Sequence, residues 1–437
     1  MKNILLFGAG RSSPSLIQYL AELSNTGNFH STVVDSVIPE NQLKNISYLV
    51  LDISNVSERQ KLIQESNLII SLLPPSLHLP IAKDCVNFAK HFITASYNSH
   101  EIQELNATAI EKGICILTEC GLDPGIDHMS ALNELDDIKA IGGIITSFKS
   151  YTGGLVAPES DNNPWHYKIT WNPKNVVLAG QGIAQFLYKN QIKRIPNQRL
   201  FSSAEKITID GVDNLEGYPN RDSLNYLQVY NLPTIETFIR GTLRKSGFCS
   251  AWNLIVQLGL TDDTAIIKNS ENLTWKEFTS SFIHAPKSKN NRHALAKLIH
   301  KGPGAQEISK LIWLGLFEDA KTGIPNATAA MLLQKKLKEK LVMKEDDKDM
   351  IVMHHIFEYT LATKKHKRTS TLILKGENKR FTAMAKTVGL PLGIAAKLIL
   401  EEKIKLTGVH IPTHQELYKP ILKELESHGI RFNTKEN

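Results

Sequence analysis

A chain of 437 residues is long enough for more than one hydrophobic core, so two or three domains are expected. Hydrophobic residues make up 42% of it and charged residues 22%, the balance of an ordinary soluble globular protein. The net charge of +7 is small for this length and no apolar run approaches about 18 residues, so neither nucleic acid nor a membrane is an expected partner.

The four cysteines show no CxxC spacing, and two of them fall in apolar, strand-like runs. This pattern predicts reduced thiols in a cytoplasmic protein, and no metal is expected. The apolar start at residues 4–7 is cut off by Gly8. It is too short for the apolar core of a secretory signal, which again favours the cytoplasm.

Short apolar runs alternate with helical patterns through about the first 120 residues. The predicted strands are 4–7, 31–35, 48–53, 68–73, 92–95 and 114–118, with helices at 14–23, 58–65 and 81–90. Buried strands separated by helices predict a parallel sheet covered on both faces, which is the α/β class of the Rossmann type.

After Gly121 the pattern is typical of a mixed or antiparallel sheet. The predicted strands are 144–151, 206–209, 236–243, 350–360 and 369–374; 260–316 predicts short helices, and 383–400 and 417–428 predict long ones, the last capped by Gly429. We expect a Rossmann-type domain of residues 1–122 completed by 383–437. The second domain, residues 123–382, is expected to be an α+β substrate domain with a mixed sheet and a small helical insertion near 260–330.

A glycine turn follows the first predicted strand. Gly8 permits a tight turn, Gly10 lets the backbone approach a pyrophosphate, and a helix starting at Pro14 points free N–H groups at that anion. Ser13 replaces the third glycine of GxGxxG and is predicted to cap the helix, with Pro14 at its first position. A plain strand–turn–helix connection is the alternative, but the place of the turn favours nucleotide binding.

Asp35 ends the second predicted strand, 25 residues beyond Gly10. A carboxylate there accepts hydrogen bonds from the adenosine ribose hydroxyls and repels a 2′-phosphate, so it predicts NAD over NADP. The alternative is a capping or surface aspartate, with Arg11 holding a phosphate. Asp52, at the end of the third predicted strand, is the candidate to face the adenine.

The residues after the sixth predicted strand combine turn-forming and reactive types. Pro124-Gly125 opens a helix and places Asp123 near the carboxyl ends of the parallel strands, where ligands of open α/β sheets bind. Ser96 and Tyr97 follow the preceding strand at the same edge. A helix N-cap is the alternative for Asp123, and a packed core histidine is the favoured interpretation of His128.

Five motifs, in order along the chain, closely resemble the glutamate-forming saccharopine dehydrogenases. They are 121–129, 150–155 with Ala157-Pro158-Glu159, Asn163-Pro164 with Tyr167-Lys168 and Trp171, 218–223 and 239–244. The resemblance implies an oxidoreductase of lysine metabolism that interconverts saccharopine, NAD(P)+ and water with L-glutamate, 2-aminoadipate 6-semialdehyde and NAD(P)H. The direction of the reaction and the oligomeric state stay open, with a homodimer as one candidate.

The resemblance also implies site residues. The catalytic candidates are Tyr97, Asp123 and Thr152. The substrate-binding candidates are Ser96, Tyr97, Asp123, Arg221, Arg240, Gly241, Thr242 and Arg244. Arg244 is our own addition, because three guanidiniums within 24 residues suit a substrate with several carboxylates. The cofactor-binding candidates from the residue pattern are Gly8, Gly10, Arg11, Ser12, Ser13, Asp35, Asp52 and Ile53, to which the resemblance adds Leu122, Gly125, Ile126, Asp127, Met129 and Trp171.

One motif departs from the family, whose usual Tyr-Cys-Gly-Gly reads Tyr151-Thr152-Gly153-Gly154 here. A threonine hydroxyl does not ionise near neutrality as a thiol can. Tyr97 and Asp123 therefore remain as equal acid–base candidates, with Thr152 at most a hydrogen-bonding residue. Two other functions stay open: an imine-reducing dehydrogenase of polyamine synthesis, of the carboxynorspermidine type, and a non-catalytic nucleotide sensor.

Overall fold

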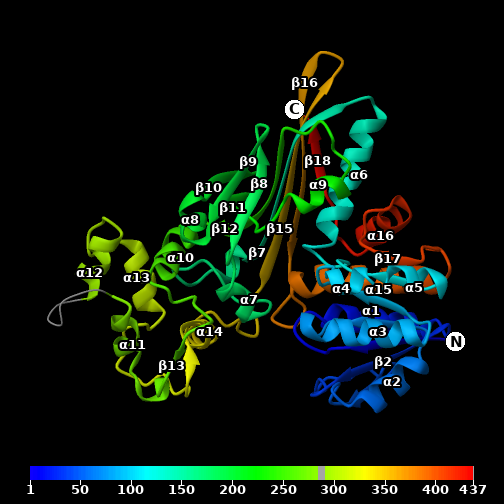
Figure 1. Ribbon diagram of the computed structural model, residues 1–437, viewed down its shortest axis with the longest axis horizontal. Coiled ribbons are helices and arrows are strands. Elements are labelled where there is room, and N and C mark those ends of the chain that lie inside the picture. The colour runs from blue at the N-terminus through cyan, green and yellow to red at the C-terminus, as the bar shows by residue number, and fades with distance from the viewer. Residues whose placement is uncertain (284–290, 437) are drawn as a thin grey trace. The chain divides into compact units, whose positions relative to one another are not determined.

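The computed structural model describes residues 1–283 and 291–436, and the chain divides into two compact units (Figure 1). Unit 1 is Met1–Ile145 with the chain from Tyr359 onward, and unit 2 is Thr146–Glu358. Both divisions fall inside long strands, β7 (Ile144–Val156) and β15 (Asp349–Leu361), whereas we expected the domains to divide near residues 122 and 383. A strand that continues from one core to the next gives no break in its hydrophobic pattern, so the sequence does not mark these divisions.

Unit 1 is built on a seven-stranded sheet in the order β17-β6-β5-β4-β1-β2-β3, and every pairing is parallel. Its strands are β1 (Lys2–Phe7), β2 (Phe29–Asp35), β3 (Ser47–Val50), β4 (Leu68–Ser71), β5 (His91–Thr94), β6 (Cys115–Leu117) and β17 (Gly408–His410). The order 3-2-1-4-5-6 is that of the doubly wound Rossmann fold. The expected fold class is confirmed, and β17 extends the sheet beyond β6.

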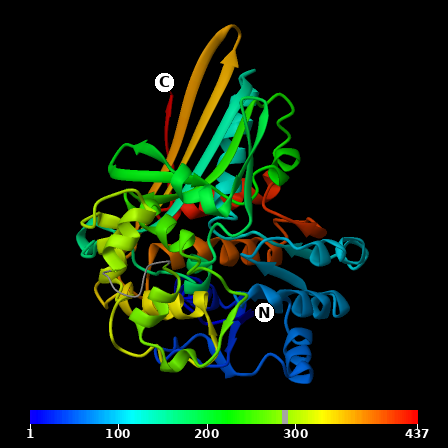
Figure 2. The same cartoon turned by 60° about the vertical axis from the view of Figure 1, so that its left-hand side comes forward.

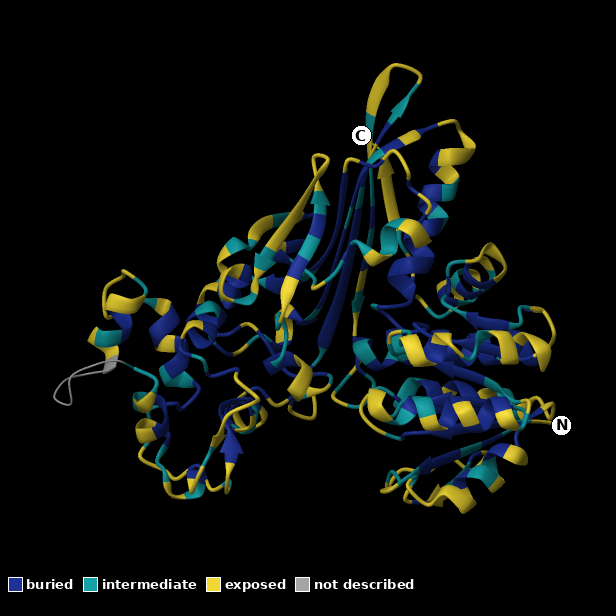
Figure 3. Ribbon diagram, in the orientation of Figure 1, coloured by how far each residue is buried: buried dark blue, intermediate teal, exposed yellow. Residues whose placement is uncertain are grey.

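The helices of unit 1 connect these strands. They are α1 (Pro14–Asn25), α2 (Val56–Gln64), η1 (Pro75–Leu77), α3 (His78–Asn87), α4 (His100–Gln103), α5 (Asn106–Glu111), α6 (Ile126–Ala140), α15 (Ala383–Leu400) and α16 (Gln415–Ser427). The side chains of Asn55, Ser99 and Thr382 accept a first-turn N–H and so fix where α2, α4 and α15 begin. Figure 3 shows both buried and exposed residues along these helices, as expected when one face packs on a sheet.

The C-terminal segment completes unit 1, as predicted. An added Cβ at Gly389 of α15 would lie 3.0 Å from the Cβ of Leu16 on α1, and one at Gly393 would lie 2.6 Å from the Tyr19 ring. The two glycines therefore let α15 approach α1 closely. Among the described residues α15 is the one helix long and apolar enough to cross a membrane, but 83% of it is buried within the structure, which is the character of a core helix.

Unit 2 contains a mixed sheet, as predicted, with the path β10-β11-β12-β7-β15. β12 runs parallel to β7 and antiparallel to β11 and β8, and β8 pairs with β9. The further strands are β8 (Ile183–Tyr188), β9 (Gln191–Pro196), β10 (Glu205–Ile209), β11 (Val212–Pro219) and β12 (Thr237–Lys245). β9 escaped prediction because its two isoleucines, Ile192 and Ile195, are three residues apart, so the sequence has no apolar alternation there.

Short helices make up the rest of unit 2, and Figure 2 shows many of them in yellow-green. They are η2 (Pro158–Ser160), α7 (Pro173–Val177), α8 (Asn197–Leu200), η3 (Phe201–Ser203), α9 (Asn225–Val229), α10 (Phe248–Gln257), η4 (Ser270–Asn272), α11 (Trp275–Ser281), α12 (Asn291–Leu298), α13 (Gln306–Trp313) and α14 (Ala329–Lys340). Trp165, Trp252 and Trp275 are at most 2% exposed and anchor their common core. The expected helical insertion also holds two short paired strands that we did not predict, β13 (Ile266–Ile267) and β14 (Ala327–Thr328).

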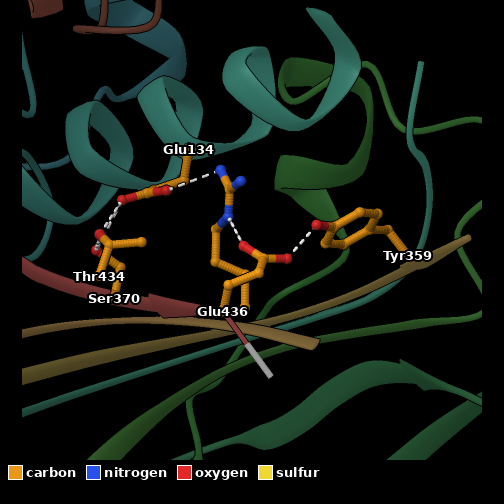
Figure 4. A network of polar contacts seen from close by, with 6 residues as sticks. Glu134, Tyr359, Ser370, Thr434 and Glu436 are labelled. Carbon is orange, nitrogen blue, oxygen red and sulfur yellow. Dashed lines mark hydrogen bonds and ion pairs between the residues drawn. The ribbon is translucent and has the colours of Figure 1, made fainter. Parts of the chain in front are cut away.

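A polar network in unit 1 fastens the last strand, β18 (Asn433–Glu436), to β16 (Lys364–Lys375), with which it pairs antiparallel (Figure 4). Its members are Glu134, Tyr359, Arg368, Ser370, Thr434 and Glu436. The Arg368 guanidinium donates from Nε to Glu436 at 2.6 Å and from Nη1 to Glu134 at 3.3 Å. Glu134 also accepts from the two hydroxyls, at 2.9 and 2.5 Å. This largely buried carboxylate on α6 is therefore satisfied by residues more than 230 positions away.

We expect Arg368→Met to destabilise unit 1 by about 2 kcal/mol, because the mostly buried Glu134 would lose its cationic partner. In calorimetry this corresponds to a fall of roughly 4–8 °C in the melting temperature for a unit of this size. Lys367→Met, at the exposed neighbouring position, is the matched control. Equal melting temperatures for the two variants would contradict this role of the network.

Candidate functional site

The glycine turn has the geometry that a pyrophosphate requires. Gly8 has φ +106°, and an added Cβ would lie 3.0 Å from the carbonyl carbon of Leu72. Gly10 is exposed, and an added Cβ there would meet nothing within 4 Å. Pro14 begins α1 as predicted, but Ser13 does not cap it: its hydroxyl donates to the Gly10 carbonyl at 2.8 Å. The prediction failed because the Ser13 hydroxyl points back to the glycine turn and not to the helix. The first turn of α1 therefore has no side-chain cap, and it contains no acidic residue.

Asp35 lies at the end of β2, as predicted, and organises this turn. Its Oδ2 accepts from the Ala9 N–H at 2.6 Å, and its Oδ1 accepts from Ser36 and Val37 at 3.1 and 3.3 Å. Asp35 is only half-buried, so it remains accessible beside the turn. The second strand is thus tied to the phosphate turn by a charged side chain.

Asp52 lies beyond the third strand rather than at its end, because β3 stops at Val50. The Asp52 carboxylate accepts from the Ser54 N–H at 2.9 Å, and the amide and hydroxyl of Ser54 lower the pKa of Asp52. This short turn leads the chain into α2. The half-buried Ile53 follows, and its carbonyl accepts from Arg59 at 2.9 Å.

A groove of 830 Å³ borders α1 next to the glycine turn. Ala9 and Ser13 line its end at the turn, and its lining includes the cations Lys44 and Arg380. Arg11, on the same turn, is exposed, and Ser12 is half-buried. The turn and the neighbouring groove therefore offer backbone N–H groups and cations to an anionic ligand.

The loop between β6 and α6 is closed by a contact between two glycines. An added Cβ at Gly125, which has φ +144°, would lie 2.1 Å from the Gly121 carbonyl oxygen. One at Gly121 would lie 2.8 Å from the Ala95 Cβ. The Ile126 N–H donates to the Gly121 carbonyl at 2.8 Å and so starts α6 directly after the turn. The half-buried Asp123 lies at the tip of this closed loop.

Asp127 and His128 support the loop from within. The Asp127 carboxylate accepts from the Gly125 N–H at 2.7 Å and so stabilises the start of α6. His128 is fully buried, as we favoured, with Nε2 3.0 Å from Glu119. The side chains of Leu122, Ile126, Asp127 and Met129 are buried as well, which limits direct contact with a ligand to the backbone at these positions.

Ser96 and Tyr97 follow β5, the strand next to β6 in the sheet. Tyr97 is 55% exposed, whereas the half-buried Ser96 is held by a network that the sequence did not reveal. His78, at the start of α3, is 2% exposed; its Nε2 lies 2.8 Å from the Ser96 hydroxyl and its Nδ1 lies 3.0 Å from the hydroxyl of Ser71, at the end of β4. No motif pointed to His78, because a single histidine opening a helix has no characteristic spacing.

In unit 2 most of the predicted substrate residues lie on β12, which pairs with β11 on one side and with β7, the strand of Thr152, on the other. Arg240 is 2% exposed and its guanidinium lies 4.2 Å from the centre of the Tyr226 ring. Gly241 lies beside Tyr151 in the sheet, and an added Cβ would meet that ring at 2.7 Å. Thr242 pairs in register with Thr152 and donates to the Asn220 side chain at 2.7 Å. The strand pairing thus brings the motifs at 150–155, 218–223 and 239–244 together.

Arg244 and Thr152 are buried polar residues with atoms left unpaired. The Arg244 guanidinium lies 5.3 Å from the ring centres of Tyr167 and Phe248, and one of its Nη atoms donates to a backbone carbonyl. Neither the Arg244 Nε nor the Thr152 hydroxyl has a hydrogen-bond partner among the described residues. Buried groups of this kind are costly unless a ligand satisfies them, which favours both as binding residues.

Two predicted residues of unit 2 lie outside its paired strands. Arg221 is exposed after β11, and its carbonyl accepts from the Gln185 N–H at 2.9 Å. Trp171 is half-buried against the helical core, and its indole N–H donates to the Tyr167 hydroxyl at 3.3 Å. The structure assigns these two residues to unit 2 and the glycine turn to unit 1.

Two family models account for nearly the whole chain. Residues 4–117 match the saccharopine dehydrogenase NADP binding domain, and residues 121–430 match the saccharopine dehydrogenase C-terminal domain. The chain belongs to the saccharopine dehydrogenase family. The family predicted from the five motifs is thereby confirmed.

Two relatives and a solved structure support the same family. The chain is 33% identical over 447 residues to the saccharopine dehydrogenase [NADP(+), L-glutamate-forming] of Schizosaccharomyces pombe, covering 99% of this chain and 98% of that protein. It is 34% identical to the mitochondrial alpha-aminoadipic semialdehyde synthase of Rattus norvegicus, of which it spans only 48%. The apo, histidine-tagged saccharopine dehydrogenase (L-Glu forming) from Saccharomyces cerevisiae superimposes with a TM-score of 0.88 at 32% identity, covering 100% of both chains.

The buried His78 predicts a pH dependence of stability. Burial lowers the pKa of His78 from 6.5 to about 4. Between these pH values His78 is protonated in the unfolded chain but not in the folded chain. The free energy of unfolding is therefore unaffected by His78 above about pH 6.5 and falls as the pH drops towards 4. We expect a loss of about 2 kcal/mol at pH 5, which His78→Gln should abolish since an amide does not titrate. Urea unfolding at pH 7.5 and pH 5 measures this difference; parallel losses in both proteins would contradict it.

Proposed function

We propose that this chain is a saccharopine dehydrogenase of the L-glutamate-forming type. It interconverts saccharopine, NAD(P)+ and water with L-glutamate, 2-aminoadipate 6-semialdehyde and NAD(P)H. The observation that carries this proposal is the match to the S. pombe enzyme at 33% identity over 98% of that protein. The resemblance to the structure from S. cerevisiae, at a TM-score of 0.88, supports the same activity.

The nicotinamide cofactor fits unit 1. Gly10 leaves open space at the turn, and the uncapped first turn of α1 presents N–H groups to a pyrophosphate. When bound, the cofactor accepts hydride from the substrate carbon beside the secondary amine, or returns it in the reverse direction. The tight contact of Gly8 with Leu72 keeps the turn against β4, so the backbone is held ready for the cofactor.

The arginines of unit 2 suit the three carboxylates of saccharopine. A guanidinium recognises a carboxylate through two parallel hydrogen bonds, and Arg221 is exposed while Arg244 has an unpaired Nε. Arg240 is held between β12 and the Tyr226 ring, which fixes its position. The Thr242 hydroxyl is committed to Asn220, and the unpaired Thr152 hydroxyl remains as a hydrogen-bonding group.

Proton transfer is assigned to Tyr97 or Asp123, which follow the neighbouring strands β5 and β6. Oxidation of the amine requires its proton to be removed, and hydrolysis of the resulting imine requires a proton to move from water to the leaving amine. Tyr97 is exposed and Asp123 half-buried, so both are accessible at the sheet edge. Thr152 has no acid–base role, because its hydroxyl does not ionise in the neutral range.

We also propose that the protein works in the reducing environment of the cytoplasm. All four cysteines are free and buried. Burial raises the pKa of each thiol, that of Cys115 to about 12, so the reactive thiolate is suppressed.

The test of the proposed activity is absorbance at 340 nm with saccharopine and either NAD or NADP. Carboxynorspermidine in the same assay tests the rival activity in polyamine synthesis. Turnover of saccharopine is the expected result, and it excludes a non-catalytic nucleotide sensor. Turnover of carboxynorspermidine alone would overturn the proposal.

Arg221→Ala should weaken saccharopine binding by about 2–5 kcal/mol, because a carboxylate would lose its cationic partner. Steady-state kinetics should show a raised Michaelis constant for saccharopine and an unchanged one for the cofactor. Arg194→Ala, at an exposed position on β9, is the matched control. An unaltered Michaelis constant in Arg221→Ala would place the carboxylate contact elsewhere.

Asp35 sets the choice of cofactor in our proposal. Its carboxylate at the end of β2 disfavours a 2′-phosphate and favours NAD, whereas the matching domain model and the S. pombe enzyme are named for NADP. We expect kcat/KM to be higher with NAD, and Asp35→Ser to raise the ratio of the NADP value to the NAD value. A preference of the unaltered enzyme for NADP would show that Asp35 serves only to hold the glycine turn.

A further inference from the structure

We propose that His78 is a positioning residue that turns the Ser96 hydroxyl into an outward hydrogen-bond donor for a substrate carboxylate. The inference rests on the proposed function and adds a residue to it. Its basis is a chain of hydrogen bonds through Ser71, His78, Thr94 and Ser96, all within unit 1.

Thr94, on β5, fixes which group donates and which accepts in this series of hydrogen bonds. The Thr94 hydroxyl donates its only proton to the Ser71 carbonyl at 2.9 Å. It can therefore only accept from its other two neighbours, the Ser96 N–H at 3.3 Å and Nε2 of His78 at 3.4 Å. Nε2 of His78 must then carry a proton.

The remaining bonds follow from this tautomer. Burial keeps the imidazole neutral, so Nδ1 has no proton and accepts from the Ser71 hydroxyl at 3.0 Å. The Nε2–H donates chiefly to the Ser96 hydroxyl oxygen, at 2.8 Å. Ser96 is thus the acceptor in this bond, and its own proton is left for another partner.

The Ser96 hydroxyl is also held in place. The Glu119 N–H donates to the Ser96 carbonyl at 2.9 Å, and the Cys120 N–H donates to the Thr94 carbonyl at 3.1 Å. Among the described residues His78 is the one partner of the Ser96 hydroxyl, and Ser96 is half-buried. Its proton therefore points to the accessible side, at the carboxyl ends of β4 and β5 where an open α/β sheet binds its ligand.

A carboxylate is the ligand group that such a donor serves best. A hydroxyl that already accepts one hydrogen bond is polarised and donates more strongly to an anion. Saccharopine carries three carboxylates, and the imidazole would act on one of them through Ser96 without touching the substrate. Loss of this bond should weaken binding of the substrate and leave binding of the cofactor almost unchanged.

The test is a double-mutant cycle with saccharopine as the substrate. His78→Phe and Ser96→Ala should each raise the Michaelis constant for saccharopine about tenfold, the effect of one buried hydrogen bond, with that for the cofactor nearly unaltered. Adding His78→Phe to Ser96→Ala should cause no further rise, because the histidine acts through the serine. His78→Gln should stay close to the unaltered enzyme, since its amide can accept from Ser71 and donate to Ser96.

The outcomes separate this inference from the proposed function. Suppose that the unaltered enzyme turns over saccharopine. If His78→Phe then leaves the Michaelis constant for saccharopine unchanged, or raises it as much in the Ser96→Ala background as in the unaltered enzyme, the role of His78 is overturned and the proposed function stands. The same holds if His78→Gln binds saccharopine as weakly as Ser96→Ala, a comparison that stands even if His78→Phe does not fold. No turnover of saccharopine by the unaltered protein would overturn both.

Discussion

The contact between Gly121 and Gly125 is the constraint on which the site in unit 1 depends. The two backbones lie so close that a Cβ at Gly125 would be 2.1 Å from the Gly121 carbonyl oxygen. This closure sets the direction of α6 and leaves the half-buried Asp123 at the tip of the loop. The preceding residues, Glu119 and Cys120, donate their N–H groups to the β5 segment and so hold Ser96 in register. This pair of glycines therefore fixes the segments that follow both β5 and β6.

The two units supply different chemistry. Unit 1 offers backbone N–H groups, hydroxyls and the side chains of Tyr97 and Asp123, which follow neighbouring parallel strands. Unit 2 offers guanidiniums on β12 and after β11, with Arg240 and Arg244 packed among aromatic rings. Aromatic surroundings keep a cation rigid without neutralising it, as a neighbouring carboxylate would. This suits a site that has to hold a substrate with several negative charges.

The sequence predicted the strands, turns and helices that are determined by residues close together in the chain. Six of the seven strands of the parallel sheet, the turn at Gly8 and the helix 383–400 follow from apolar runs and glycine placement. β17 was missed, since a three-residue strand has no periodic pattern and pairs only through a partner nearly 300 residues away. The Ser13 cap was wrong because the hydroxyl donates to the Gly10 carbonyl instead of accepting a first-turn N–H, and the sequence does not rank these two partners. His78 was missed for the same reason as β17: its partners are brought together by the sheet and not by spacing.

The packing of α15 on α1 has a consequence for the order in which the protein is made. A chain leaves the ribosome from its N-terminus, so α1 and the glycine turn appear almost 370 residues before the helix that covers them. During that interval Leu16 and Tyr19 lack the surface that Gly389 and Gly393 later provide. The glycine turn is therefore among the first parts synthesised and among the last to reach its final packing.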